Sequence, residues 1–166
     1  RELFDLKRES ASEDESNERL IELEKEFLGL KLEESRKLVE QFPNDYSRRF
    51  KYGEYLLESG FIDGAIQQFQ ISQRSPSLRI KSLVLLVRCF MAKDLFDLAL
   101  EQLKRAAESL NVMDDFKKEV IYLLAQCFKR LERDLEANEE YKAIYANNIG
   151  YKDVAQKIDI FYGKKR

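Results

Sequence analysis

Residues 59–69 read SGFIDGAIQQF, and residues 93–103 read KDLFDLALEQL. The two stretches carry the same pattern 34 positions apart, with Ala65 of the first opposite Ala99 of the second. A repeat of this period is typical of stacked helical units, each of which is one pair of helices. The repeated stretch therefore predicts a chain that is built of stacked helix pairs.

The pattern occurs a third time, as LERDLEANEEY over residues 131–141. Ala137 stands there where the earlier copies have their alanine, after a spacing of 38 residues that indicates a longer loop. Four positions after each alanine is a bulky residue, which is Phe69, Leu103 or Tyr141. Helices packed about 8–10 Å apart need a small residue opposite a bulky one, so this alternation predicts interlocking helix pairs.

The rest of the chain fits an all-α fold. Apolar residues recur at spacings of three and four, and no run alternates as a half-buried strand would. We predict a right-handed superhelix of antiparallel helix pairs that form three repeats, with a long N-terminal helix and a C-terminal capping helix. The shorter helices are predicted over residues 46–59, 62–74, 78–92, 95–110, 116–131, 134–146 and 152–162.

The sequence divides into four parts. Ser12 followed by Glu15 is a capping-box pattern, which favours a helix that starts near residue 13. The predicted parts are an N-terminal segment with an acidic linker over 1–12, a long helix or degenerate repeat half over 13–43, three helix pairs over 44–148, and a capping helix with a basic tail over 149–166. The helix pairs are expected at 44–76, 77–111 and 114–148.

This pattern resembles the tetratricopeptide repeat (TPR) family over roughly residues 46–146. The period, the small and large positions and the proline or asparagine in the loops agree with the family. Gly60 stands at the family's turn glycine, whereas Asp94 and Glu132 occupy that place in the later units. The tail NNIGYKDVAQKI also resembles the ending of some bacterial TPR proteins, which favours a bacterial source.

Composition argues against several classes of function. The chain has 29 basic and 31 acidic residues, a net charge of −2, and no basic stripe interleaved with aromatic residues, so we predict no nucleic-acid binding. It has no histidine, which excludes His-based nucleophiles and His metal sites within this chain, and it has no phosphate-cradling glycine loop. We therefore predict a protein that is not an enzyme, with no catalytic residue, cofactor or metal.

Cys89 and Cys127 stand at equivalent places in two repeats. Neighbouring helices lie about 8–10 Å apart, beyond the roughly 7 Å that a disulfide usually spans, so we interpret both as core residues. The low cysteine content favours a reducing, cytoplasmic compartment. The chain opens at Arg1 rather than Met, which indicates a fragment or a processed chain and leaves its location open. The longest apolar run, 83–87, is too short to insert in a membrane.

The resemblance to the TPR family implies a concave groove lined by the first helix of each unit. Apolar side chains there would hold an apolar anchor, and Lys51, Arg88 and Lys129 would pair with acidic groups of an extended or helical peptide. The predicted function is a scaffold or protein–protein interaction module that binds an unidentified protein or peptide. The predicted groove residues are Phe50, Lys51, Glu54, Leu57, Lys81, Val84, Arg88, Met91, Glu119, Tyr122, Gln126 and Lys129.

Three alternatives remain open at this point. The apolar stripe of the long helix, with Leu20, Leu23 and Phe27, would instead form a homodimer, and the chain would be a homo-oligomerisation module. The chain would otherwise be a regulatory part of a larger enzyme. The first residues, RELFDL, carry Leu3 and Phe4 and would dock on a groove of their own chain or of a neighbour.

Overall fold

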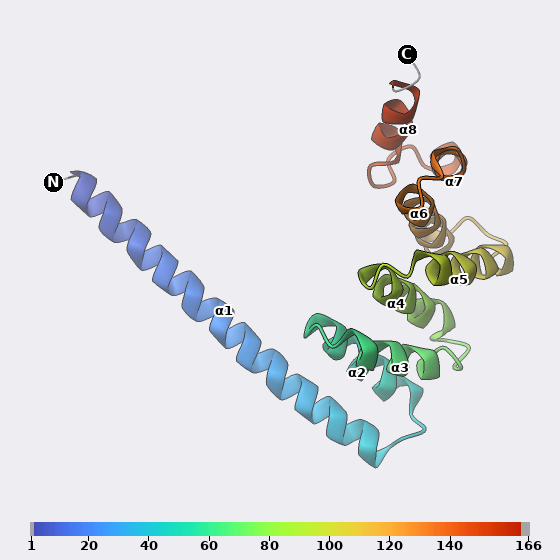
Figure 1. Ribbon diagram of the computed structural model, residues 1–166. Coiled ribbons are helices and arrows are strands. Elements are labelled where there is room, and N and C mark those ends of the chain that lie inside the picture. Colours follow the sequence, from blue (N-terminus) through green and yellow to red (C-terminus); the bar gives the residue numbers. More distant parts are fainter. Residues whose placement is uncertain (1, 164–166) are drawn as a thin grey trace.

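The computed structural model describes the backbone of residues 2–163 and the side chains of residues 14–163. Within that range the chain forms eight α-helices and no strand. Helices α2 to α8 are stacked one after another, and the long helix α1 extends to one side of the stack (Figure 1). The all-α prediction is confirmed, and helices α2 to α8 begin and end within two residues of the predicted positions. The helices are α1 (Glu2–Gln41), α2 (Tyr46–Glu58), α3 (Ile62–Ser72), α4 (Arg79–Ala92), α5 (Phe96–Ser109), α6 (Asp115–Arg130), α7 (Asp134–Asn147) and α8 (Val154–Gly163).

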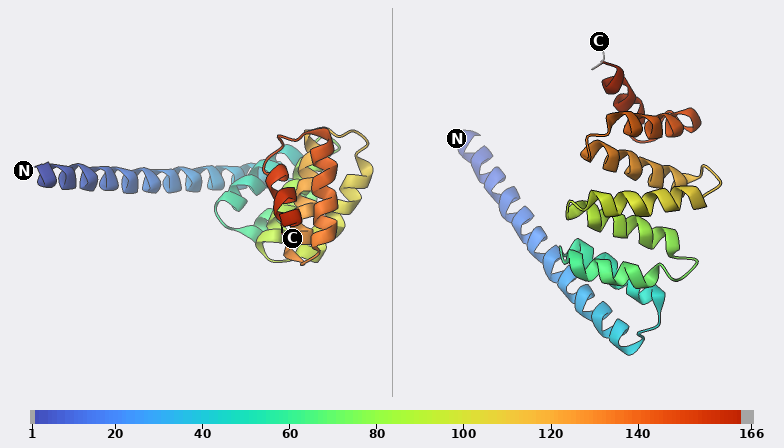
Figure 2. Two further views of the ribbon diagram at one scale, coloured as in Figure 1. Left: turned by 90° about the horizontal axis from the view of Figure 1, so that it is seen from above. Right: turned by 45° about the vertical axis from the view of Figure 1, so that its right-hand side comes forward.

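The helices pack in sequential pairs. α2 contacts α3, α4 contacts α5 and α6 contacts α7, while α8 packs on α7 at the end of the stack (Figure 2). The first helices of successive pairs also contact one another, because α4 touches both α2 and α6. Over the described residues no such contact joins α3, α5 and α7 to each other. The first helices are thus closer together and lie on the inner face of the superhelix.

The small and bulky positions of the repeat form the core. Ala65, Ala99 and Ala137 are fully buried, and so are the bulky residues that follow them. In the first pair the two helices approach closely at Gly53, where an added Cβ would lie 2.8 Å from Cε1 of Phe69. A side chain at residue 53 would therefore displace the Phe69 ring. The repeat pattern of the sequence is a packing pattern, as predicted.

The turn within each repeat uses left-handed backbone. Gly60 has a φ of 80°, and Asp94 and Glu132 both have a φ of 58°. Each residue follows the end of its helix and lets the next amide donate back to a carbonyl, as Arg133 N does to Phe128 O at 2.9 Å. Only glycine adopts this conformation without steric cost, so the second and third turns hold a strained residue.

Replacing Glu132 by glycine should relieve this strain. Within the described part of the chain the Glu132 side chain makes no hydrogen bond or ion pair, so its loss removes little. We expect Glu132→Gly to raise the free energy of unfolding by about 1 kcal/mol. Chemical denaturation of the two proteins measures the difference. Gly60→Ala is the matched control and should change stability by a similar amount in the opposite direction. A Glu132→Gly variant less stable than the parent would contradict this reading of the turn.

Helix α1 begins earlier than expected. It starts at Glu2, so its backbone is helical through residues 2–12, where the sequence analysis placed a separate segment with a linker. The reason is that no glycine or proline precedes Gly29, and Leu, Glu, Lys and Arg favour continuation of a helix. The predicted docking of Leu3 and Phe4 falls outside the described side chains.

The two halves of α1 have different surroundings. Its C-terminal half packs on α2 through a face that includes Leu32, Ser35 and Val39, of which Ser35 and Val39 are buried. The N-terminal half extends away from the stack, as the view from above in Figure 2 shows. Over the described residues, α2 is the one helix that α1 contacts. Leu20, Leu23 and Phe27 are consequently exposed.

Candidate partner-binding groove

The inner face of the superhelix is hollowed where α4 and α6 meet the loop before α8. The cavity has a volume of about 280 Å³ and unites five of the twelve predicted groove residues. Lys152, from the loop, also lines it and was missed by the sequence analysis, because it lies beyond the repeats. The lining residues are Arg88, Met91, Glu119, Tyr122, Leu123, Gln126 and Lys152.

Glu119 is the centre of a charged network in this cavity. Arg88 donates from Nη2 to one carboxylate oxygen at 2.7 Å, and the Tyr151 hydroxyl donates to the other at 3.0 Å. The Lys152 ammonium donates to that second oxygen as well. Partial burial of Glu119 disfavours its charged form, but the donors from Lys152, Arg88 and Tyr151 outweigh this and lower its pKa. Two cations thus surround one carboxylate, which leaves the site net positive.

A cluster of three tyrosine rings packs beside this charged network. The Tyr122 ring makes edge-to-face contacts with Tyr141 and Tyr151, at centroid distances of 5.9 and 6.1 Å. Lys152 Nζ lies 4.3 Å from the centre of the Tyr122 ring, and the Tyr122 hydroxyl donates to Asp153 Oδ1 at 2.6 Å. Burial of Tyr122 and this hydrogen bond raise its pKa, so the phenol stays neutral. The cluster fixes the loop residues 151–153 against α6.

The other seven predicted groove residues lie elsewhere. The apolar ones, Phe50, Leu57 and Val84, are half-buried and pack against the core. Phe50 makes an edge-to-face contact with the Phe69 ring at 5.8 Å. The structure places the charged ones as follows: Lys51 pairs with Glu54 at 3.0 Å, Lys81 is exposed on α4, and Lys129 pairs with Asp134 at 2.6 Å.

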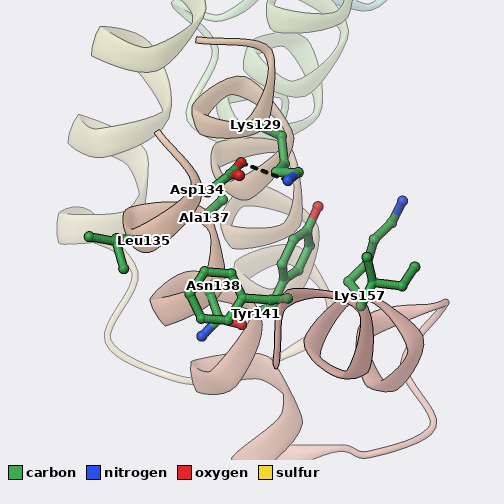
Figure 3. Close-up of a pocket in the computed structure, with 9 residues that line it drawn as sticks. Lys129, Asp134, Leu135, Ala137, Asn138, Tyr141 and Lys157 are labelled. Atoms are coloured by element: carbon green, nitrogen blue, oxygen red, sulfur yellow. Dashed lines mark hydrogen bonds and ion pairs between the residues drawn. The ribbon is translucent and has the colours of Figure 1, made fainter. Parts of the chain in front are cut away.

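A second cavity lies between α7 and α8, at the end of the stack (Figure 3). Its volume is about 350 Å³, and apolar side chains such as Leu135, Ile160 and Phe161 form much of its lining. Asn138 also lines it and is only 3% exposed, yet its Oδ1 has no hydrogen-bond partner among the residues that the structure describes. The equivalent residue of the second repeat, one position after the small alanine, is the buried Leu100.

This comparison between repeats predicts a stabilising substitution. Asn138→Leu removes a buried acceptor that lacks a partner and adds apolar volume to a cavity that has room for it. We expect the free energy of unfolding to rise by about 1 kcal/mol. Urea denaturation measures the change, and Asn138→Asp, which would bury a charge, is the control expected to destabilise. A loss of stability in Asn138→Leu would show that Asn138 has a partner in solution.

The remaining candidate sites give no sign of chemistry. Cys89 and Cys127 are buried free thiols, as predicted, and burial raises the pKa of each to about 11. In the part of the chain that the structure describes, no three His, Cys, Asp or Glu side chains gather in a way that would hold a metal ion. Nor is any helix of that part long and apolar enough to span a bilayer.

The stacked pairs with their inner groove define the class of protein: a helical-repeat protein with a TPR-like superhelical fold. Among solved structures, those of MamA share this fold. One has a TM-score of 0.70 at 18% sequence identity and covers 85% of this chain and 75% of its own. Another has a TM-score of 0.69 at 19% identity and covers 81% and 76%. No protein-family model matches the chain, and no curated protein matches it.

Proposed function

We propose that the chain is a protein-interaction module that binds a peptide segment of its partner in the cavity between α4 and α6. The observation that carries this proposal is the network of Arg88, Glu119 and Lys152, which is preorganised on the inner face and has one uncompensated positive charge. A preformed site loses little conformational freedom on binding, which favours affinity. The proposed action is binding alone, with no bond made or broken.

The lining of the cavity indicates the chemistry of the peptide. Arg88 and Lys152 supply donors for a carboxylate, while Met91 and the ring of Tyr122 supply an apolar surface beside them. A segment in which an acidic residue lies next to an apolar anchor would satisfy both. TPR-like superhelices of this shape expose such grooves along their inner face, and the MamA structures share that shape. A cytoplasmic location and a bacterial source stay predictions.

A peptide library displayed on phage tests the proposal. Peptides selected on the purified protein should be rich in acidic and apolar residues, and Arg88→Glu should weaken their binding by about tenfold or more. Arg105→Glu is the matched control, because Arg105 is an exposed cation on the second helix α5. Equal binding by all three proteins would overturn the proposal.

Self-association through α1 is a second candidate function. The observation that favours it is the exposed apolar stripe of Leu20, Leu23 and Phe27 on the half of α1 that extends from the stack. Sedimentation velocity over a range of concentrations should reveal a dimer, and Phe27→Glu should remain monomeric throughout. A monomer at every concentration of the parent protein would exclude this second function and leave the groove proposal intact.

A further inference from the structure

The free face of α1 has the spacing of a coiled-coil seam. Leu20, Leu23, Phe27 and Leu30 follow one another at intervals of three, four and three residues. They are 55%, 47%, 58% and 71% exposed, although each is a large apolar side chain. In a two-stranded coiled coil these are the a and d positions of two successive heptads, which insert between side chains of the facing helix.

A different face of the same helix contacts the repeats. Leu28 is half-buried, Leu32 packs against the core, and Ser35 and Val39 are buried. Since successive residues turn by about 100° around a helix, the two faces point about 130° apart. The seam is therefore distinct from the face that packs on the repeats, and α2 borders it at its C-terminal end, where Lys31 Nζ lies 5.6 Å from the centre of the Tyr55 ring. The seam also includes no residue of the groove between α4 and α6.

Each flank of the seam carries one positive and one negative residue. Arg19 and Glu26 precede the a positions, and Glu24 and Lys31 follow the d positions. Lys31 already lies along the seam, with its Nζ 4.2 Å from the centre of the Phe27 ring. In a parallel pair in register, each residue before an a position meets the residue five positions later in the other helix. Arg19 then meets Glu24 and Glu26 meets Lys31, so all flanking pairs are attractive.

An antiparallel pair would reverse this pattern. To keep the apolar layers it would set Leu20 opposite Leu30 and Leu23 opposite Phe27. Glu24 of each helix would then lie beside Glu24 of the other, and Glu26 beside Glu26. Like charges at both flanks of the central layers disfavour that arrangement, and such flanking charges are what set orientation in coiled coils. The sequence along the free face thus distinguishes between the two orientations.

We propose that two copies of this chain associate through residues 19–31 as a parallel, in-register coiled coil. The proposal rests on the second candidate function and adds the orientation and register of the pair. Two heptads bury less than the roughly 800 Å² per partner of a standard interface. The dimer is therefore expected to be weak, and its fraction should rise with protein concentration. The segment 14–31 has six acidic and three basic residues, a balance that argues against an anionic membrane as the occupant of this face.

Disulfide trapping tests the orientation. Leu23→Cys alone should form a covalent dimer on mild oxidation, because residue 23 meets residue 23 in the parallel pair. A mixture of Leu23→Cys and Phe27→Cys should give the two homodimers and little mixed dimer. The parent protein is the control, since Cys89 and Cys127 are buried. Predominance of the mixed dimer would overturn the parallel arrangement while leaving self-association standing, whereas absence of any dimer by sedimentation would overturn both.

Charge exchange tests the register. Glu24→Lys places like charges beside Arg19 and should raise the Kd of the dimer by about threefold or more, and Arg19→Glu with Glu24→Lys should restore it. Lys25→Glu is the control, because residue 25 lies on the side of the helix opposite the seam. Residues 19, 24 and 25 are all exposed on α1, so circular dichroism should show unchanged helix content in each variant. An unchanged Kd in Glu24→Lys, or no restoration in the double variant, would overturn the proposed register.

Discussion

Phe69→Ala is expected to lower the free energy of unfolding by about 3–5 kcal/mol. Phe69 is fully buried in α3, where its ring contacts Phe50 at a centroid distance of 5.8 Å and closes on the backbone at Gly53. Removal of the ring leaves a cavity. Because α3 is held by the helices on either side of it, it cannot move to close this cavity. Guanidinium or urea denaturation followed by circular dichroism measures the loss.

An exposed phenylalanine in the same repeat provides the control. Phe61 is 59% exposed at the start of α3, so Phe61→Ala should change stability by less than about 0.5 kcal/mol. If the two variants lost similar amounts, Phe69 would not be the packing residue of the first helix pair. The repeat pattern would then have no energetic basis there.

The second large effect is expected from overpacking at a small position. Ala99 is fully buried on α5, which packs against α4, and a close-packed interior has little room for a larger side chain. Ala99→Leu should lower the free energy of unfolding by about 1–3 kcal/mol, because the extra carbons force neighbouring side chains or backbone to shift. The measurement is again denaturation at equilibrium.

Ala143→Leu is the matched control for this substitution. Ala143 is exposed on α7, so the same added volume meets solvent and should be tolerated. Two variants of equal stability would contradict the interpretation of Ala65, Ala99 and Ala137 as the positions where helices cross. A difference of more than about 1 kcal/mol would support it.

The sequence was sufficient to predict the helix pairs because the repeat encodes local packing. The spacing between Ala65, Ala99 and Ala137 placed the units, and prolines or left-handed turn residues placed the helix ends. The start of α1 was not predictable in the same way. Residues 2–28 lack any helix-breaking residue, and a solvated acidic helix has the same composition as a linker.

The groove was predicted only in part, for a geometric reason. Residues on the first helices share a period, but the crossing angle decides which of them face the solvent and which face a neighbouring helix. The Phe50 ring packs against the Phe69 ring of its own repeat, whereas Arg88 and Glu119, from two different repeats, form a hydrogen bond. Lys152 reaches Glu119 from 33 positions away, in a loop that carries no repeat pattern, so no feature of the sequence predicted this contact.

Photo-crosslinking of a selected peptide tests most directly the claim that the inner face between α4 and α6 is the binding surface. The photoreactive amino acid benzoylphenylalanine is introduced at Met91 or Gln126, which line the cavity, and at Arg105 on the outer helix α5. Crosslinks are expected from residues 91 and 126 and none from residue 105. Crosslinks from residue 105 alone, or equally from all three, would contradict it.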